Sequence, residues 1–149
     1  MKTSFMGRAL IFILVILLVL PTVAGCGRKI TLDDAKYTMA KFFSALDDAD
    51  YDEILSLLHK SSSMTKTNIQ NFLSSVEDKL CASFDDGITN IRYNSYSELP
   101  YNGVPGGSKF RVDGSFNIGK VQNVSFIILL VMDSQGYGIN VIDFGGVAL

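Results

Sequence analysis

The sequence contains few of the residues on which catalytic and metal sites most often depend. Its 149 residues include one histidine, two cysteines and no tryptophan. Two cysteines are too few for a disulfide framework or a clustered thiolate metal site. The chain also has no basic patch, and its 13 basic residues are outnumbered by 15 acidic ones. We therefore expect no metal and no cofactor, and no nucleic-acid partner, since such partners need clustered positive charge.

The first 25 residues have the layout of a secretory signal peptide. Lys2 and Arg8 give a basic start, residues 9–20 form an uninterrupted apolar run, and Pro21 and the small residues 23–25 follow. The run has 12 residues, whereas a helix needs roughly 20 to cross a bilayer. The pattern therefore predicts an export signal and not a permanent membrane span.

The end of this leader, Val23-Ala24-Gly25-Cys26, resembles the lipobox of bacterial lipoproteins. The family most often has Leu where Val23 stands here. The resemblance implies that the thiol of Cys26 is acylated and that the chain is cut just before it, so that the mature protein is anchored by lipid on the extracytoplasmic face of a membrane, inner or outer. A free cysteine after an ordinary signal-peptidase site and an uncleaved anchor are the alternatives.

The mature chain has the size of one domain. Removal of residues 1–25 leaves 124 residues with 11 basic and 15 acidic side chains, and hence a net charge of −4. This length is enough for one hydrophobic core. We assign residues 26–31 to the lipidated Cys26 and a short tether, and residues 32–149 to a single α+β domain.

Three amphipathic helices are expected first. Thr31 and Asp34 form a capping-box-like start to a helix that runs to the acidic break at residues 47–50. Asp50 can open a short second helix. Apolar residues at spacings of three and four over residues 69–80 predict the third.

The second half of the chain is typical of strands. Alternating patterns indicate strands near residues 88–96, 109–118, 121–132 and 137–144, with a turn-rich loop at 99–108. Short turns make the last three an antiparallel meander. Residues 126–132 are apolar on both faces, so we expect that strand to be central and covered on both sides. The fold class is therefore α+β, with N-terminal helices packed on a curved antiparallel sheet.

Over roughly residues 32–145 this order of elements resembles the nuclear transport factor two-like, or cystatin-like, superfamily, and above all its small bacterial lipoproteins of unassigned function. The resemblance implies a cone-shaped fold. It also implies that an enzyme of this kind would use Asp, Tyr or His side chains inside the cone. No residue of this chain matches a catalytic motif of that superfamily.

The titratable side chains and the second cysteine all have simple structural interpretations. We expect His59 to be a solvated residue at a helix end, Asp113 to be exposed, and Asp133 to begin a turn. We interpret Asp143 as a carboxylate at a strand end, and Cys81 as a small buried hydrophobe.

The aromatic residues give the one positive indication of a site. Tyr93, Phe110, Phe116 and Phe126 belong to the face of the sheet expected to be concave, where they could line a pocket. Ordinary core packing is the alternative. The sequence thus predicts a non-catalytic, lipid-anchored envelope domain that binds a partner. A carrier or sensor of a small apolar ligand is the first alternative, and an isomerase- or dehydratase-like enzyme is the second.

Overall fold

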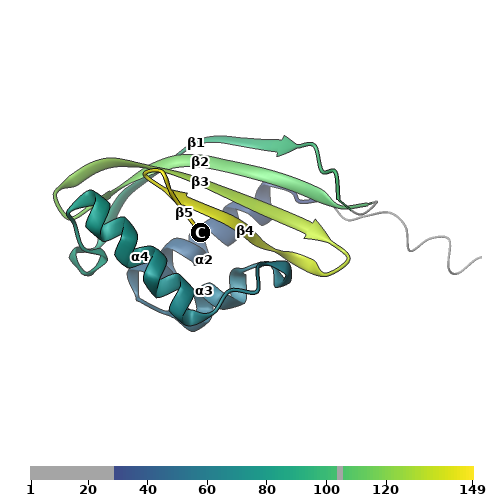
Figure 1. Ribbon diagram of the computed structural model, residues 1–149. Coiled ribbons are helices and arrows are strands. Elements are labelled where there is room, and N and C mark those ends of the chain that lie inside the picture. The colour runs from purple at the N-terminus through teal and green to yellow at the C-terminus, as the bar shows by residue number, and fades with distance from the viewer. Residues whose placement is uncertain (1–28, 104–105) are drawn as a thin grey trace, which may run out of the picture.

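Three α-helices precede a five-stranded antiparallel sheet in residues 29–103 and 106–149, the residues that the computed structural model describes (Figure 1). The helices are α2 (Leu32–Asp47), α3 (Tyr51–Leu57) and α4 (Lys66–Leu80), with short 3-10 helices η2 (Lys60–Ser62) and η3 (Phe84–Asp86). The strands follow in sequence order: β1 (Ile88–Leu99), β2 (Ser108–Ile118), β3 (Val121–Asp133), β4 (Gly136–Phe144) and β5 (Val147–Ala148). The predicted α+β class is confirmed.

The helices begin where polar side chains replace missing backbone hydrogen-bond partners. Thr31 accepts the backbone N–H of Asp34, and the Asp34 carboxylate accepts the N–H of Thr31 at 3.0 Å, which completes a capping box. Asp50 caps α3, and Thr65 caps α4. The helix starts predicted at Thr31 and Asp50 are therefore confirmed, because capping depends on residues only a few positions apart.

Strand β3 lies between β2 and β4, as its apolar composition predicts. In the β2–β3 pair, Ser108 lies opposite Met132 at one end and Ile118 lies opposite Val121 at the other. In the β3–β4 pair, Asp133 lies opposite Gly136 next to the turn. Strand β5 has no counterpart in the sequence-based prediction. It pairs with the end of β4 after a turn in which Gly145 and Gly146 have φ angles of 57° and 81°, a conformation that glycine adopts without a steric penalty.

The helices all lie on one side of the sheet (Figure 1). Within the described residues no helix covers the other side, so β3 is central but is not covered on both faces as expected. The sheet is also open and not strongly curled, which differs from the expected cone. Strands β1 to β4 pair along most of their length, with register shifts in each ladder, and this pairing leaves a broad outer face.

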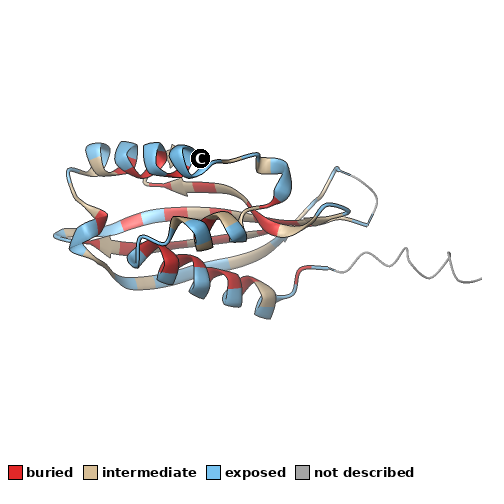
Figure 2. Ribbon diagram, turned by 90° about the horizontal axis from the view of Figure 1, so that it is seen from below, coloured by how far each residue is buried: buried red, intermediate tan, exposed pale blue. Residues whose placement is uncertain are grey.

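The core lies between the helices and the inner face of the sheet. Every second residue of β2 is buried, while the residues between them are partly exposed. Figure 2 shows buried and exposed positions alternating along α2 and α4 in the way that amphipathic helices require. Ile30 also belongs to this core, and its backbone N–H donates to the buried Ser108 Oγ at 3.0 Å.

Candidate functional site

The aromatic residues predicted to line a pocket lie in or beside the core. Phe116 is 0% exposed, Phe126 is 1% exposed and Phe110 is buried, whereas Tyr93 is 38% exposed at the edge of the cluster. The Phe116 ring has four aromatic neighbours, with centroid distances of 5.8 Å to Phe43, 6.4 Å to Phe84, 6.4 Å to Phe126 and 5.1 Å to Phe144. These rings fill the space between the helices and the sheet, where a ligand pocket was the prediction.

Tyr93 packs edge-on against Phe43 and Phe126, with centroid distances of 6.4 Å and 5.9 Å. Burial, and after it the nearby Tyr96, raises the pKa of Tyr93 to about 12. The hydroxyl therefore stays protonated at neutral pH. Two carboxylates of the sheet have hydrogen-bond partners other than Tyr93. Asp113 accepts hydrogen bonds from Arg111 and Ser95, and Asp143 accepts one from the Gly146 N–H.

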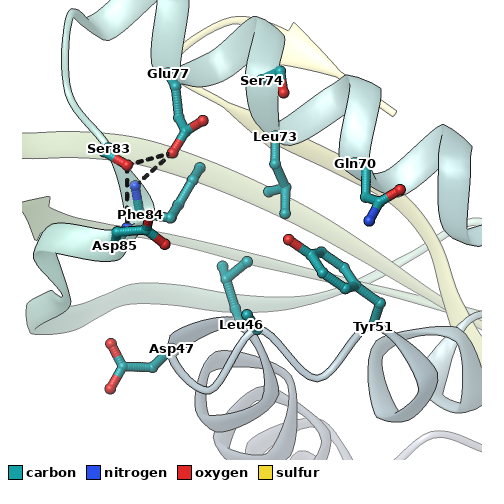
Figure 3. Close-up of a pocket in the computed structure, with 11 residues that line it drawn as sticks. Leu46, Asp47, Tyr51, Gln70, Leu73, Ser74, Glu77, Ser83, Phe84 and Asp85 are labelled. Atoms are coloured by element: carbon teal, nitrogen blue, oxygen red, sulfur yellow. Dashed lines mark hydrogen bonds between the residues drawn. The ribbon is translucent and has the colours of Figure 1, made fainter.

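A polar cavity of about 310 Å³ opens between the end of α2, the start of α3 and the middle of α4 (Figure 3). Acidic residues from three elements line it, namely Asp47, Glu77 and Asp85. Glu77 is held in place, since its Oε1 accepts the Ser83 hydroxyl at 2.9 Å and the Phe84 N–H at 2.7 Å. The cavity opens at the surface, and Phe84 of the aromatic core forms part of its lining.

A second surface hollow of about 290 Å³ lies between α2, α3 and β4. Tyr37, Leu57 and Tyr137 are among its lining residues. The Tyr137 hydroxyl is fixed 2.7 Å from the Thr38 hydroxyl and donates to the Asp34 carbonyl at 3.1 Å. This hollow combines aromatic and aliphatic surface with a few oriented polar atoms.

His59 is not the solvated residue that the sequence indicated. Its side chain is 1% exposed, because its backbone N–H pairs with the Ile139 carbonyl at 2.7 Å and draws the residue against the edge of β4. The Ser61 backbone N–H donates to Nδ1 at 3.3 Å. Since Nδ1 is therefore an acceptor, Nε2 carries the proton, and it lies 3.1 Å from Asp133 Oδ1 and 3.3 Å from the Gly136 carbonyl.

We call the hydrogen-bonded residues Ser61, His59, Asp133 and Tyr101 the His59 cluster, and Asp133 lies at its centre. It begins the β3–β4 turn, as predicted, and accepts the Gln135 N–H at 2.7 Å and the Tyr101 hydroxyl at 3.0 Å. The hydrogen bond from Gln135, and after it those from Tyr101 and His59, lower the pKa of Asp133 below the ordinary value of a carboxyl. The cluster joins the α3–α4 connection, the β1–β2 loop and the β3–β4 turn.

The His59 cluster also contains a serine, a histidine and a carboxylate in hydrogen-bonded order. Ser61 Oγ lies 2.7 Å from His59 Nδ1, so the ring could accept a proton from that hydroxyl. The same nitrogen caps η2 by accepting the Ser61 N–H, which is a local structural role. Sequence reasoning missed the cluster because Asp133 is 74 positions from His59 and no local pattern connects them.

The outer face of the sheet carries an apolar strip, which we define as Ile127, Leu129 and Val141. Phe126, Ile128 and Leu130 point into the core, so Ile127 and Leu129 point to the other face. Leu129 lies opposite Val141 on β4. The residues of the strip are partly exposed, and Arg111 and Asp113, paired through Arg111 Nη2 at 2.6 Å, stand beside it on β2.

Of the two cysteines, only Cys81 belongs to the described residues. Cys26, the predicted lipidation site, lies outside the described residues. Cys81 is free and exposed, which corrects the expectation of a buried side chain. It ends α4 in the left-handed conformation, with φ 51°, and this places the residue beyond the amphipathic turn that would have buried it.

No protein-family model matches the chain, and no curated protein matches it. Across residues 29–103 and 106–149, no group of three or more His, Cys, Asp or Glu side chains could hold a metal ion. None of the helices in those residues is long and apolar enough to cross a membrane. The packing of the interior and the exposed surfaces are therefore the structural features that bear on function.

Proposed function

We propose that the protein is a lipid-anchored, extracytoplasmic, non-catalytic domain that binds a partner protein of the cell envelope. The lipobox-like segment that ends at Cys26 supports the anchor. Acylated N-termini with two or more chains give stable attachment, because each buried methylene contributes about 0.8 kcal/mol. The domain is then an accessory part of the envelope, held at the membrane surface.

The observation that carries the partner-binding part of the proposal is the apolar strip on the outer face of the sheet. The three residues of the strip stay partly exposed, whereas the apolar residues on the inner face of β3 are buried. Exposed apolar surface beside polar residues is typical of protein–protein contacts. Arg111 and Asp113, a charged pair on the neighbouring strand, would lie at the polar rim of such a contact.

The filled interior supports binding by the surface over the carriage of a ligand in the core. Phe116 and Phe126 are almost fully buried among other rings, and a ligand there would have to displace them. The second surface hollow, with Tyr37 and Tyr137, favours the carrier alternative, since it could hold a small apolar molecule. The enzyme alternative would depend on the His59 cluster.

We also propose that the domain is related to the cystatin-like superfamily. The order of elements supports this, with helices before an antiparallel sheet and all of them packed on one face. The weak curl of the sheet is the main departure. A solved structure of a lipoprotein with the same order of elements, the same register and a similarly open sheet would support the relationship.

The anchor is tested by processing. Cys26→Ser in a bacterium that lipidates exported proteins should block acylation and cleavage, and membrane fractionation with mass spectrometry of the mature chain should show this. An N-terminus at any residue other than Cys26 in the wild-type protein, or an unmodified Cys26, would contradict the proposal.

The partner is tested by a photo-reactive amino acid in place of Leu129 in the lipidated protein. We expect a cross-link to a different protein. The matched control replaces Asn117, which lies on the same face near the end of β2 and away from the strip. A product of twice the mass of the chain would show that the partner is a second copy, a cross-link only to lipid or a small molecule would favour the carrier, and equal cross-linking from both positions would argue against the strip.

A further inference from the structure

The position of Ile30 determines which end of the domain is nearest to the lipid. Ile30 is buried and its N–H donates to Ser108 Oγ, so the chain is attached to the fold at this residue. Between Cys26 and Ile30 the chain can span at most about 14 Å, because each residue adds about 3.5 Å. If Cys26 lies at the membrane surface, the start of β2 lies within that distance of it.

We call this part of the molecule the anchor end. It contains the start of α2, the end of β1 and the start of β2, and also the β3–β4 turn, since Ser108 pairs with Met132. The opposite, far end contains the β2–β3 turn and η3. Strand β2 has 11 residues and extends about 33 Å between the two ends, so the chain cannot bring both ends close to the membrane together unless the domain lies flat.

The two ends carry different charge. At the anchor end basic and acidic residues are mixed: Arg28 and Lys29 precede it, Glu98 pairs with Lys29, Asp33 and Asp34 lie in the first turn of α2, and Asp133 begins the β3–β4 turn. The far end gathers acidic residues from α2, α4 and η3, which share cavities or face the β2–β3 turn: Asp47, Glu77, Asp78, Asp85 and Asp86. An anionic bilayer repels this acidic far end when it comes within a Debye length of about 8 Å, whereas the mixed charges of the anchor end oppose the approach of the bilayer less.

Leu32 gives the anchor end an apolar contact. It is the first residue of α2 and is 44% exposed, and side chains on a helix lean toward its N-terminus, which here is the end from which the tether leaves. If Cys26 is acylated, Leu32 follows the lipid by only a few residues and stands at the same end of the domain.

We propose that the bilayer holding Cys26 is also a docking surface for the anchor end, with Leu32 among the headgroups and the acidic far end directed away from the membrane. This inference rests on the proposed lipid anchor. Its consequence is that the outer face of the sheet stands upright on the membrane, where a neighbouring envelope protein can reach it.

The absence of tryptophan from the chain makes a direct experiment possible. Leu32→Trp introduces a single tryptophan at an exposed position, and Ser134→Trp does the same in the β3–β4 turn in case the first variant does not fold. Lys120→Trp, in the turn at the far end, is the matched control. Each lipidated mature variant is reconstituted into vesicles of phosphatidylcholine and phosphatidylglycerol, with or without lipids brominated near the headgroup.

We expect a blue shift and loss of most of the emission for Leu32→Trp, quenching for Ser134→Trp, and neither effect for Lys120→Trp. Mass spectrometry of the same samples reports acylation of Cys26. An acylated protein in which Leu32→Trp is not quenched, or in which Lys120→Trp is quenched equally, would overturn the proposed orientation and leave the anchor intact. A protein that is not acylated would overturn both.

Discussion

Phe116→Ala tests whether the interior of the domain is a packed core or a space for a ligand. The Phe116 side chain is 0% exposed and touches four other aromatic rings. A buried aromatic side chain removes about 150–250 Å² from water, which at about 25 cal/mol per Å² stabilises the fold by about 4–6 kcal/mol. Measured Phe→Ala substitutions in cores cost about 3–5 kcal/mol, and we expect a loss in this range.

Such a loss is a large part of the stability of a small domain, which is about 5–15 kcal/mol in total. For a domain of this size it corresponds to a decrease in Tm of about 10–20 °C. Urea and thermal unfolding followed by circular dichroism would measure it. Tyr37→Ala is the matched control, since Tyr37 is 64% exposed and its removal should cost less than about 1 kcal/mol.

The same variant separates a core from a binding site. Removal of the Phe116 ring should leave an apolar cavity able to bind a molecule such as benzene, which would raise the Tm of Phe116→Ala and leave that of the wild-type protein unchanged. Similar losses from Phe116→Ala and Tyr37→Ala would refute the packing argument. A wild-type protein stabilised by benzene would move the ligand carrier ahead of partner binding.

Two further predictions concern the His59 cluster. The lowered pKa of Asp133 means that its carboxylate stabilises the folded state at neutral pH, and that this stabilisation is lost as the pH falls below about 4. Asp133→Asn should therefore lower the free energy of unfolding at pH 7 and reduce the pH dependence of that free energy between pH 5 and 3. Urea midpoints measured across this range would test it. Because His59 Nδ1 has a structural role, capping η2 by accepting the Ser61 N–H, a fluorophosphonate probe should not label the protein. Labelling that disappears in Ser61→Ala would contradict the non-catalytic proposal.

The helices show how much local sequence can predict. Thr31 with Asp34, and Asp50 at the next start, predicted the beginnings of α2 and α3 because a capping hydrogen bond spans only three residues. The apolar spacing in residues 69–80 likewise predicted α4. These features depend on side chains that are already neighbours in the chain, so the pattern contains the information needed.

The candidate site could be predicted only in part. The lipidation of Cys26 stays a prediction from a contiguous pattern. The environment of His59 could not be predicted, because Asp133 reaches it from the β3–β4 turn and is itself bonded by Tyr101 from the β1–β2 loop. Cys81 follows an amphipathic helix and was expected to be buried, but the left-handed turn at its position exposes it.

The sequence by itself determined the class of the domain, the order of its helices and the four long strands, and the central place of β3, because each of these follows from the composition and period of a continuous segment. Only the tertiary structure decided that the sheet stays open, that the phenylalanines fill the interior, and that Ile127 and Leu129 remain on an uncovered face. Those properties depend on how far the helices extend over the sheet and on which distant side chains meet, and both are set by packing across the whole domain.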